Sequence, residues 1–207
     1  MKNLTKSDCE KYLQYGNLTQ PFLGNEYVLN KVLIDYNHKI KENKNYTKID
    51  ALYNWIHHCM DGKPQQEEKN NVKFKRTAKE IWESGFASGC TDYATVFATF
   101  ARQIGIPTTL LHTAEYNWVR GLQNNENQPI HVGHSFCECF YEDRWVLVDP
   151  TFRKIEKKYN SDKITLSYQV SKSNIYIPYF RGLDLGKKQS VREHNEIMDK
   201  ECIGLQL

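Results

Sequence analysis

The sequence lacks the long apolar segments that membrane proteins and secreted precursors carry. Its 207 residues are 40% hydrophobic, and its longest apolar runs are too short to span a bilayer. Lys2 in the N-terminal segment has no apolar core behind it, so the segment is not typical of a signal peptide. We therefore expect a cytoplasmic protein without a membrane partner; the sequence does not address secretion by another route.

A strong excess of one charge is also missing. The chain has 28 Lys and Arg against 25 Asp and Glu, a formal net charge of +3. The basic residues do not gather in one stripe, as they commonly do in proteins that bind nucleic acid. The sequence therefore predicts no nucleic-acid partner.

Metal-binding patterns are weak. No Asp-x-Asp-x-Asp-Gly loop of the calcium-binding type occurs. The possible zinc ligands form two clusters, His57, His58 and Cys59 in one and His131, His134, Cys137 and Cys139 in the other. Neither cluster has the paired spacing of a structural zinc site. The sequence therefore predicts no metal and no other cofactor.

Cysteine is present at six positions: Cys9, Cys59, Cys90, Cys137, Cys139 and Cys202. In a chain of this length without a secretion signal we expect reduced thiols. Cys137 and Cys139 share one face of an expected strand, so they are not expected to bond to each other.

Apolar periodicity predicts helices first and strands afterwards. Residues 1–45 are expected to form a helical N-terminal extension, and residues 46–207 the main domain. Expected helices are 47–60, one from Thr77 and 90–104, with loops at 61–76 and 115–130. Expected strands are 108–112, 134–141, 145–149, 164–170 and 175–180. Helices followed by antiparallel strands indicate an α+β fold.

Three distant residues carry the predicted chemistry: Cys90 in SerGlyCysThrAspTyr, His134 in GlyHisSerPhe and Asp149 in ValAspProThr. Cys90 lies where the helix begins, and free N–H groups and the helix dipole stabilise a thiolate there. His134 opens one strand and Asp149 closes the next, so a hairpin would bring both to the same end. Alone, each has a structural explanation: an inert buried thiol, a satisfied imidazole and an Asp-Pro turn. Together they are the parts of a thiolate nucleophile with an oriented base.

These motifs resemble those of the transglutaminase-like superfamily. The segment beginning GlyCysThrAspTyr is similar to that family's nucleophile helix. HisSerPheCysGluCysPhe and ArgTrpValLeuValAspProThr are similar to its histidine strand and its Trp-x3-Asp-Pro-Thr strand. The resemblance runs from about Ala51 to Thr151. It implies a papain-like α+β core in which the nucleophile helix packs on an antiparallel sheet, with Cys90 as nucleophile, His134 as general base and acid, and Asp149 as the residue that orients it.

The rest of the resemblance is less complete. Phe136 stands where many members have Trp, a change that should only reshape the cleft wall. Asp92 matches an acidic position common in bacterial members, although a favourable charge in the first helical turn explains it equally well. ArgGlyLeuAspLeuGly at 181–186 resembles a closing segment of such members. For the oxyanion hole, the Cys90 N–H is the natural donor, and the side chains of Trp55, Trp82 and Gln103 are candidates for a second.

We therefore predict a cysteine-dependent acyl-transfer enzyme that acts on amide bonds of a peptide or protein through a thioester, most simply a peptidase or amidase. Transamidation or deamidation of protein glutamine is an alternative, but no sequence feature indicates an amine pocket that excludes water. An arylamine-acetyltransferase-like transfer would also use Cys, His and Asp, but there is no coenzyme A signature. A protein of another class, a transglutaminase-like binding protein without turnover, would have a Cys90 thiol of ordinary pKa.

Overall fold

A computed structural model of the chain describes residues 3–22, 25–128, 130–162, 166–170 and 173–205. The helices are α1 (Asn25–Glu42), α2 (Lys48–Cys59), α3 (Gln66–Val72), α4 (Ala78–Ser84), α5 (Cys90–Gln103), α6 (Tyr116–Gln123) and α7 (Val191–Ile203), after the short 3-10 helices η1 (Lys6–Asp8) and η2 (Lys11–Leu13). The strands are β1 (Thr108–Glu115), β2 (Gly133–Tyr141), β3 (Arg144–Asp149), β4 (Lys154–Glu156), β5 (Leu166–Val170) and β6 (Ser173–Gly182).

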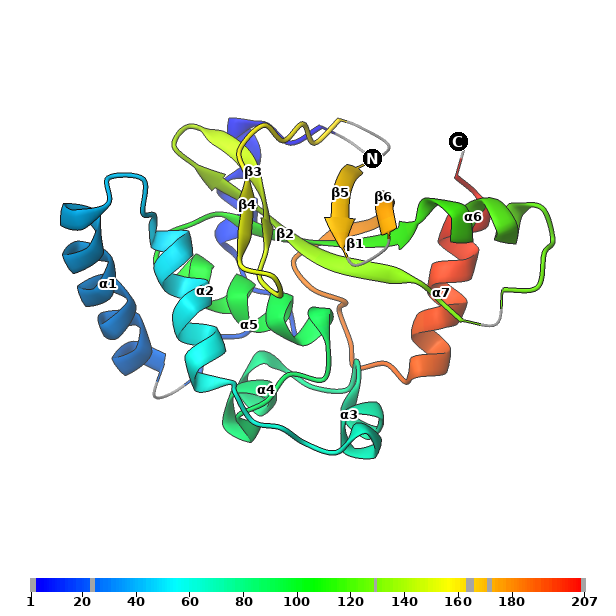
Figure 1. Cartoon of the computed structure of the whole chain (residues 1–207), viewed down its shortest axis with the longest axis horizontal. Coiled ribbons are helices and arrows are strands. Elements are labelled where there is room, and N and C mark those ends of the chain that lie inside the picture. Colours follow the sequence, from blue (N-terminus) through cyan, green and yellow to red (C-terminus); the bar gives the residue numbers. More distant parts are fainter. Residues whose placement is uncertain (1–2, 23–24, 129, 163–165, 171–172, 206–207) are drawn as a thin grey trace.

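The strands form one sheet in the order β4-β3-β2-β1-β6-β5, and all neighbouring strands are antiparallel. Figure 1 shows this sheet with α5, α2 and α1 towards one end and α6 and α7 towards the other. The predicted α+β fold, with the helix of Cys90 packed on an antiparallel sheet, is therefore confirmed.

Helix α5 is the centre of the core because its apolar residues recur at helical spacing. Ala94, Phe97 and Ala101 are completely buried, and the stripe that they form packs on the sheet and on α2. The helix stops where Gly105 adopts a φ of 79°, a left-handed conformation that favours glycine. This packing fixes the axis of α5 and with it the position of its first residue, Cys90.

The two faces of the sheet have different coverings. Residues opposite each other across a ladder share a face, so Leu110 and its partner Cys137 face the core beneath α5. By the same alternation, Ala114 is on that face too, and it packs against α6 and α7. Helices α5 and α7 thus cover one face at different places. The opposite face holds Leu111 and Phe136, in a separate apolar cluster.

Strands β2 and β3 form the predicted hairpin. Tyr141 pairs with Arg144, and the two residues between them, Glu142 and Asp143, have φ angles of 51° and 62°. Positive φ at both central residues is the geometry of a two-residue turn that matches strand twist. The hairpin therefore sets the register that places the start of β2 beside the end of β3.

Two segments expected to be loops contain helices. Residues 61–76 include α3, and both Phe74 and Arg76 are buried rather than exposed. Residues 115–130 include α6, where the Glu115 carboxylate caps the helix by accepting the Trp118 N–H at 2.9 Å, and Trp118 is itself buried. Both expectations were wrong. Helix α6 is stabilised by buried tertiary contacts that no local pattern reveals, whereas α3 itself buries no residue.

The C-terminal region differs from the expectation chiefly by α7, a helix that the sequence analysis did not identify. Ser190 and Glu193 form a capping box at its start. The strand expected at 175–180 is longer, and residues 164–165 of the other expected strand lie outside the described residues. In the part of the chain that the structure describes, no helix combines the length and the apolar character needed to cross a membrane.

The N-terminal residues pack on the rest of the molecule at two places. Val32 of α1 is completely buried in the core that contains α2 and α5. Leu4 and Tyr12 pack against Trp145 of β3, where Tyr12 and Trp145 meet edge to face. The N-terminal helical extension thus contributes to both sides of the molecule, while its division from the main domain at residue 45 stays a prediction.

Candidate active site

Cys90 is the first residue of α5. Its N-cap, Gly89, makes no side-chain hydrogen bond to the helix, so the first N–H groups have no cap from that residue. Cys90 is partly exposed and lines a cavity of about 120 Å³ that His134 also lines. The structure therefore places the thiol where the helix dipole favours its anionic form and where a ligand can reach it.

His134 and Asp149 are in direct contact at the open end of the hairpin. The Nε2 atom of His134 lies 2.9 Å from Oδ2 of Asp149, and the two side chains are 5% and 0% exposed. The other carboxylate oxygen, Oδ1, accepts the backbone N–H groups of Thr151 at 2.9 Å and Phe152 at 3.1 Å. Asp149 is thereby fixed on both sides. Because Nε2 faces the carboxylate, Nδ1 is the ring nitrogen left for the thiol.

Cys90 and His134 change each other's protonation. Burial acts to raise the pKa of Cys90, but hydrogen bonds from His134 and Ser135 and the charge of His134 hold that pKa below its ordinary value. Burial acts to lower the pKa of His134, but hydrogen bonds with Asp149 and Cys90 raise it to about 9. Both directions favour a thiolate–imidazolium pair at neutral pH. The three residues that the sequence analysis singled out are thus brought together, although their catalytic roles remain a proposal.

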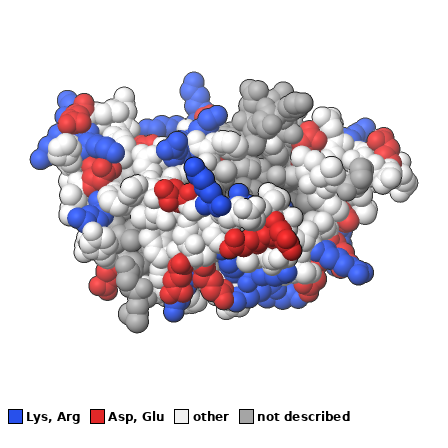
Figure 2. All heavy atoms as spheres, turned by 60° about the horizontal axis from the view of Figure 1, so that its bottom comes forward, with Lys and Arg blue, Asp and Glu red and all other residues white. Residues whose placement is uncertain are grey.

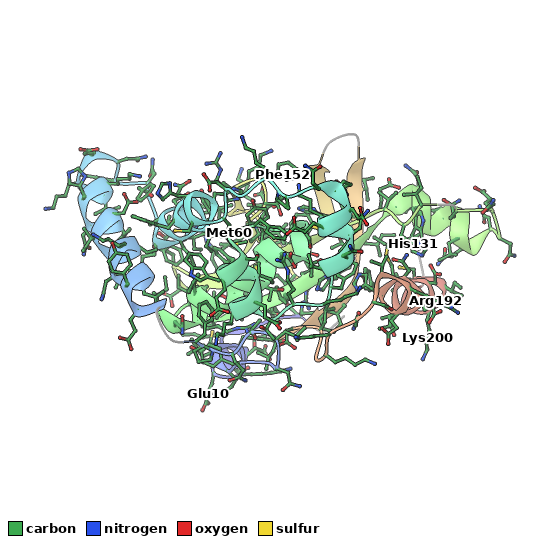
Figure 3. All side chains as sticks on the ribbon, turned by 90° about the horizontal axis from the view of Figure 1, so that it is seen from below. Glu10, Met60, His131, Phe152, Arg192 and Lys200 are labelled. Carbon is green, nitrogen blue, oxygen red and sulfur yellow. The ribbon has the colours of Figure 1, made fainter. Side chains whose placement is uncertain are left out.

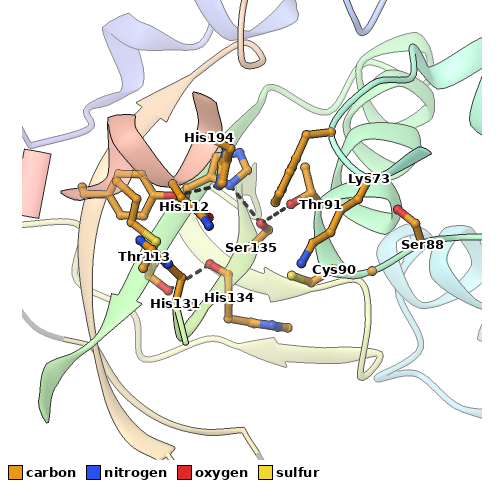
Figure 4. Close-up of a pocket in the computed structure, with 16 residues that line it drawn as sticks. Lys73, Ser88, Cys90, Thr91, His112, Thr113, His131, His134, Ser135 and His194 are labelled. Atoms are coloured by element: carbon orange, nitrogen blue, oxygen red, sulfur yellow. Dashed lines mark hydrogen bonds between the residues drawn. The ribbon is translucent and has the colours of Figure 1, made fainter. Parts of the chain in front are cut away.

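Ser135 is a site residue that the sequence analysis did not identify. Its Oγ lies 2.9 Å from Nδ1 of His112 and 3.0 Å from Oγ1 of Thr91, and both the side chain and the backbone of Ser135 hydrogen-bond to Cys90. Figure 4 shows these groups beside the thiol. Ser135 and His112 are register partners. The available signal was alternation, which places Ser135 on the strand face that α5 covers.

The turn before Cys90 is held by Asp92. Its Oδ2 accepts the N–H of Ser88 at 2.8 Å and the hydroxyl of Ser88 at 2.7 Å. The same oxygen pairs with the guanidinium of Arg76, which also donates to the carbonyl of Phe86 at 3.2 Å. The first-turn position expected for Asp92 is correct. Its buried partner, Arg76, was missed because it belongs to a segment interpreted as a loop.

His57 supports the segment on the other side of the site. Its Nε2 lies 2.7 Å from the carbonyl oxygen of Pro150, and its ring stacks on Tyr93 of α5 with 4.4 Å between ring centres. This contact links α2 and α5 to the residue after Asp149. His57 therefore has a structural role that accounts for its presence without a metal ligand role.

The three side chains considered as second donors of the oxyanion hole, those of Trp55, Trp82 and Gln103, do not line the cavity of Cys90. Trp82 packs edge to face on Phe100 in the core, and Gln103 is at the opposite end of α5, about 20 Å along the helix axis from Cys90. Trp82 and Gln103 are therefore wrong as second oxyanion donors, while the candidacy of Trp55 stays a prediction.

Phe136 and the segment 181–186 both have structural roles near the site and do not form its surface. The Phe136 ring is completely buried, edge on to His134 with 4.7 Å between ring centres, so it supports that imidazole rather than forming the cleft surface. Asp184 accepts N–H groups from Leu18 and Thr19, which fastens the N-terminal segment. The segment 181–186 thus holds the N-terminal segment in place through Asp184.

The described residues contain no group of three or more His, Cys, Asp or Glu side chains arranged to hold a metal ion. Cys137 and Cys139 are buried beneath α5, whereas His131 contacts Asp199, with Nε2 2.8 Å from Oδ1. His131 of the second cluster considered for zinc thus has Asp199 as its partner, while Cys137 and Cys139 of that cluster lie in the core.

Comparison with known proteins places this arrangement in a family. None of the curated proteins compared with the chain matches it. A solved structure called "a Putative Cysteine Protease from Cytophaga hutchinsonii" shares 14% identity with it, at a TM-score of 0.48. That alignment covers 89% of this chain and 50% of the other, so the chain spans half of that protein's length. The sequence model of the transglutaminase-like superfamily matches residues 34–150, which include Cys90, His134 and Asp149. The chain belongs to the transglutaminase-like superfamily.

Proposed function

We propose that the protein is a cysteine-dependent acyl-transfer enzyme that cleaves amide bonds of peptides or proteins, with hydrolysis as the outcome. The observation that carries the proposal is the contact of the Cys90 thiol with His134, whose other ring nitrogen is held by Asp149. An inert buried cysteine would have its pKa raised by burial, whereas the pKa of Cys90 is lowered. Membership of the transglutaminase-like superfamily supports the same chemistry.

Each group has one task in the proposed reaction. The Cys90 thiolate attacks the amide carbonyl carbon, and the new S–C bond converts the carbonyl into an oxyanion that the Cys90 N–H stabilises. The His134 imidazolium then gives its proton to the amide nitrogen as the C–N bond breaks and the amine leaves. Water attacks the resulting thioester, His134 takes up the proton that water loses, and the S–C bond breaks to release the acid and restore the thiolate. Asp149 holds the imidazole in the orientation that all these steps need.

Hydrolysis follows from the accessibility of the site. Cys90 is partly exposed, and its cavity is open to solvent in part. Water at high concentration competes with any amine for a thioester in such a cleft. Transamidation would need a second pocket that holds the amine and excludes water, and no observation in the described residues favours it.

The pH dependence of Cys90 alkylation by iodoacetamide tests the proposal. We expect a thiol that reacts well below the ordinary cysteine pKa of about 8.5, with a second change near the pKa of about 9 of His134. His134→Ala should restore an ordinary titration, while Cys59→Ser, which alters a thiol of raised pKa, should not alter the profile. A Cys90 thiol with ordinary pKa in the unmodified protein would contradict the proposal and favour a binding protein without turnover.

A substrate test completes the design. Internally quenched peptides that the protein cleaves should remain intact with Cys90→Ala, because the nucleophile is gone. Cleavage that continues in that variant would rule out the thioester route even if the thiol is reactive.

A further inference from the structure

A cavity beside Cys90 extends towards α7. Its floor is formed by His112 and Ser135 of the sheet, and its walls include Phe74, Tyr179 and Met198. At about 120 Å³ it is large enough to hold several water molecules or a small polar group. No Asp or Glu is among the described residues that line it. A small substrate group adjacent to the reacting carbonyl would therefore meet no Asp or Glu carboxylate on these walls.

Lys73 supplies a positive charge at this cavity. Among the described residues no carboxylate lies within ion-pair distance of its Nζ, which is 5.1 Å from the centre of the Phe74 ring. Its charge reaches the interior: the pKa of His194 is lowered to about 4, mainly by burial and in addition by Lys73 and His131. His131 is itself paired with Asp199, and Figure 3 shows His131 beside α7. Lys73 is thus a cation of the cleft with no ion-pair partner among the described residues.

A strained backbone turn at Phe74, called the corner below, holds Lys73 at the edge of the cavity. The next residue, Phe74, has a φ of 62°, which is costly for a bulky side chain and persists only where surrounding contacts enforce it. Its ring stacks on His194 with 3.7 Å between ring centres, and its carbonyl accepts the N–H of Gln189 at 2.9 Å. The corner is therefore fastened to α7 and to the segment before it. Figure 4 shows the Lys73 side chain extending from this corner towards Cys90.

We propose that this cavity binds a carboxylate group of the substrate adjacent to the scissile amide, with Lys73 as its specificity-determining residue; this inference rests on the proposed function. The carboxylate is that of an acidic side chain or of a free chain terminus. Partial burial strengthens the attraction between Lys73 and an anion relative to open water. On the face shown in Figure 2 basic and acidic residues are interspersed, so the selectivity arises locally at Lys73 rather than from a broad surface field.

The first test compares two alkylating reagents that differ in charge. Iodoacetate carries a carboxylate and iodoacetamide does not, so the ratio of their second-order rate constants at Cys90 measures the preference for an anion beside the sulfur. We expect Lys73→Met to lower this ratio at least about fivefold and Lys73→Glu to lower it further. Lys75→Met is the matched control, because Lys75 is exposed, lies two residues away and does not line the cavity.

A ratio that stays within twofold of the unmodified protein in Lys73→Met, or that falls equally in Lys75→Met, would overturn the carboxylate subsite while leaving the activated thiol intact. If neither reagent modifies Cys90 at neutral pH, the proposed function itself fails, and this inference with it. The two failures are therefore distinguishable.

The second test uses internally quenched peptides in two sets. One set carries Asp or Glu, against Asn or Gln, next to the scissile amide; the other carries a free C-terminal carboxylate against a terminal amide. We expect kcat/KM to favour the carboxylate member at least about fivefold in one set, and Lys73→Glu to reverse that preference. The set that responds identifies the source of the carboxylate, whereas equal rates in both sets would refute the proposal.

Discussion

Arg76 and Asp92 form a buried ion pair directly behind the turn that leads into Cys90; their side chains are 8% and 3% exposed. The pair joins the end of the segment after α3 to the first turn of α5. Removing one partner leaves the other charge buried without compensation, so we expect Arg76→Met to lower the free energy of unfolding by about 3–5 kcal/mol. Urea denaturation measures this loss.

Lys79→Met is the control for Arg76→Met. Lys79 pairs with Glu83 on the surface, where the side chains are 57% and 60% exposed, and surface pairs contribute about 0–1 kcal/mol. Equal urea midpoints for the two variants would show that the Arg76 pair is not important for stability. If the Arg76→Met variant remains folded, the alkylation of its Cys90 should also be slower, because the turn before Cys90 has lost the ion pair that holds it.

Asp149→Asn should reduce activity by about 10²–10⁴-fold with little change in the fold. The asparagine keeps an oxygen for the N–H groups of Thr151 and Phe152 but loses the charge that raises the pKa of His134. The imidazolium is then less stable, and the pKa of Cys90 should rise towards that of an ordinary thiol. The pH profile of iodoacetamide alkylation measures the change in the pKa of Cys90, and the urea midpoint measures any change in the stability of the fold. An unchanged profile would remove Asp149 from the proposed mechanism.

Ser135→Ala should shift the alkylation profile of Cys90 to higher pH, because one of the hydrogen bonds that stabilise the thiolate is lost. It also leaves Nδ1 of the buried His112 without its partner at 2.9 Å, a loss of about 1–3 kcal/mol in stability. His112→Phe in the same protein removes that orphaned group. We expect the double variant to be more stable than the sum of the single changes predicts, by about 0.5–3 kcal/mol. Strict additivity would show that Ser135 and His112 are not coupled.

Acid should destabilise the protein through two buried histidines. Burial lowers the pKa of His112 to about 3 and that of His194 to about 4, whereas an unfolded histidine titrates near 6.5. The unfolded chain therefore takes up protons below pH 6.5 that the folded chain refuses, so stability falls as the pH decreases, by up to about 1.4 kcal/mol per pH unit for each group. His134 acts in the opposite direction: its pKa of about 9 gives stability that is complete below pH 6.5 and is lost as the pH rises to 9.

Urea midpoints between pH 4.5 and 9 check this dependence. His194→Gln should flatten the acid limb, and His58→Gln, at an exposed position, should leave it unchanged. A midpoint that is constant between pH 6.5 and 5 would mean that the buried histidines do not control acid stability.

The strong periodic elements could be predicted from the sequence. The apolar stripe of α5 and the alternation of β2 and β3 gave the helix of Cys90 and the hairpin of His134 and Asp149, because each is determined by local pattern. Helix α6 was missed because it is only eight residues long, lies in a segment rich in Asn and Gln, and is stabilised by the burial of Trp118, a tertiary contact. Helix α7 did carry a sequence signal, the Ser190–Glu193 capping box.

The surroundings of the thiol could not be predicted in the same way. Lys73, His112 and Ser135 come from three segments of the chain. His112 and Ser135 meet when β1 pairs with β2, and the segment of Lys73 joins them through the contact of Phe74 with α7. No spacing relates them, and each residue type is common at ordinary surface or core positions. The three proposed catalytic residues lie in recognisable sequence motifs. The residues that adjust the pKa of Cys90 or line the substrate cavity are positioned by long-range packing.

The separation of Cys90 from its two partners has a consequence for the nascent chain. His134 and Asp149 belong to one hairpin with a two-residue turn, so they can meet as soon as that hairpin forms. The thiol belongs to a helix more than forty residues earlier and joins them only when α5 docks on the sheet. Until docking, Cys90 is an ordinary thiol of about pKa 8.5. The sulfur therefore becomes reactive only once α5 has docked on the sheet, and a molecule in which α5 is undocked lacks the reactive thiolate.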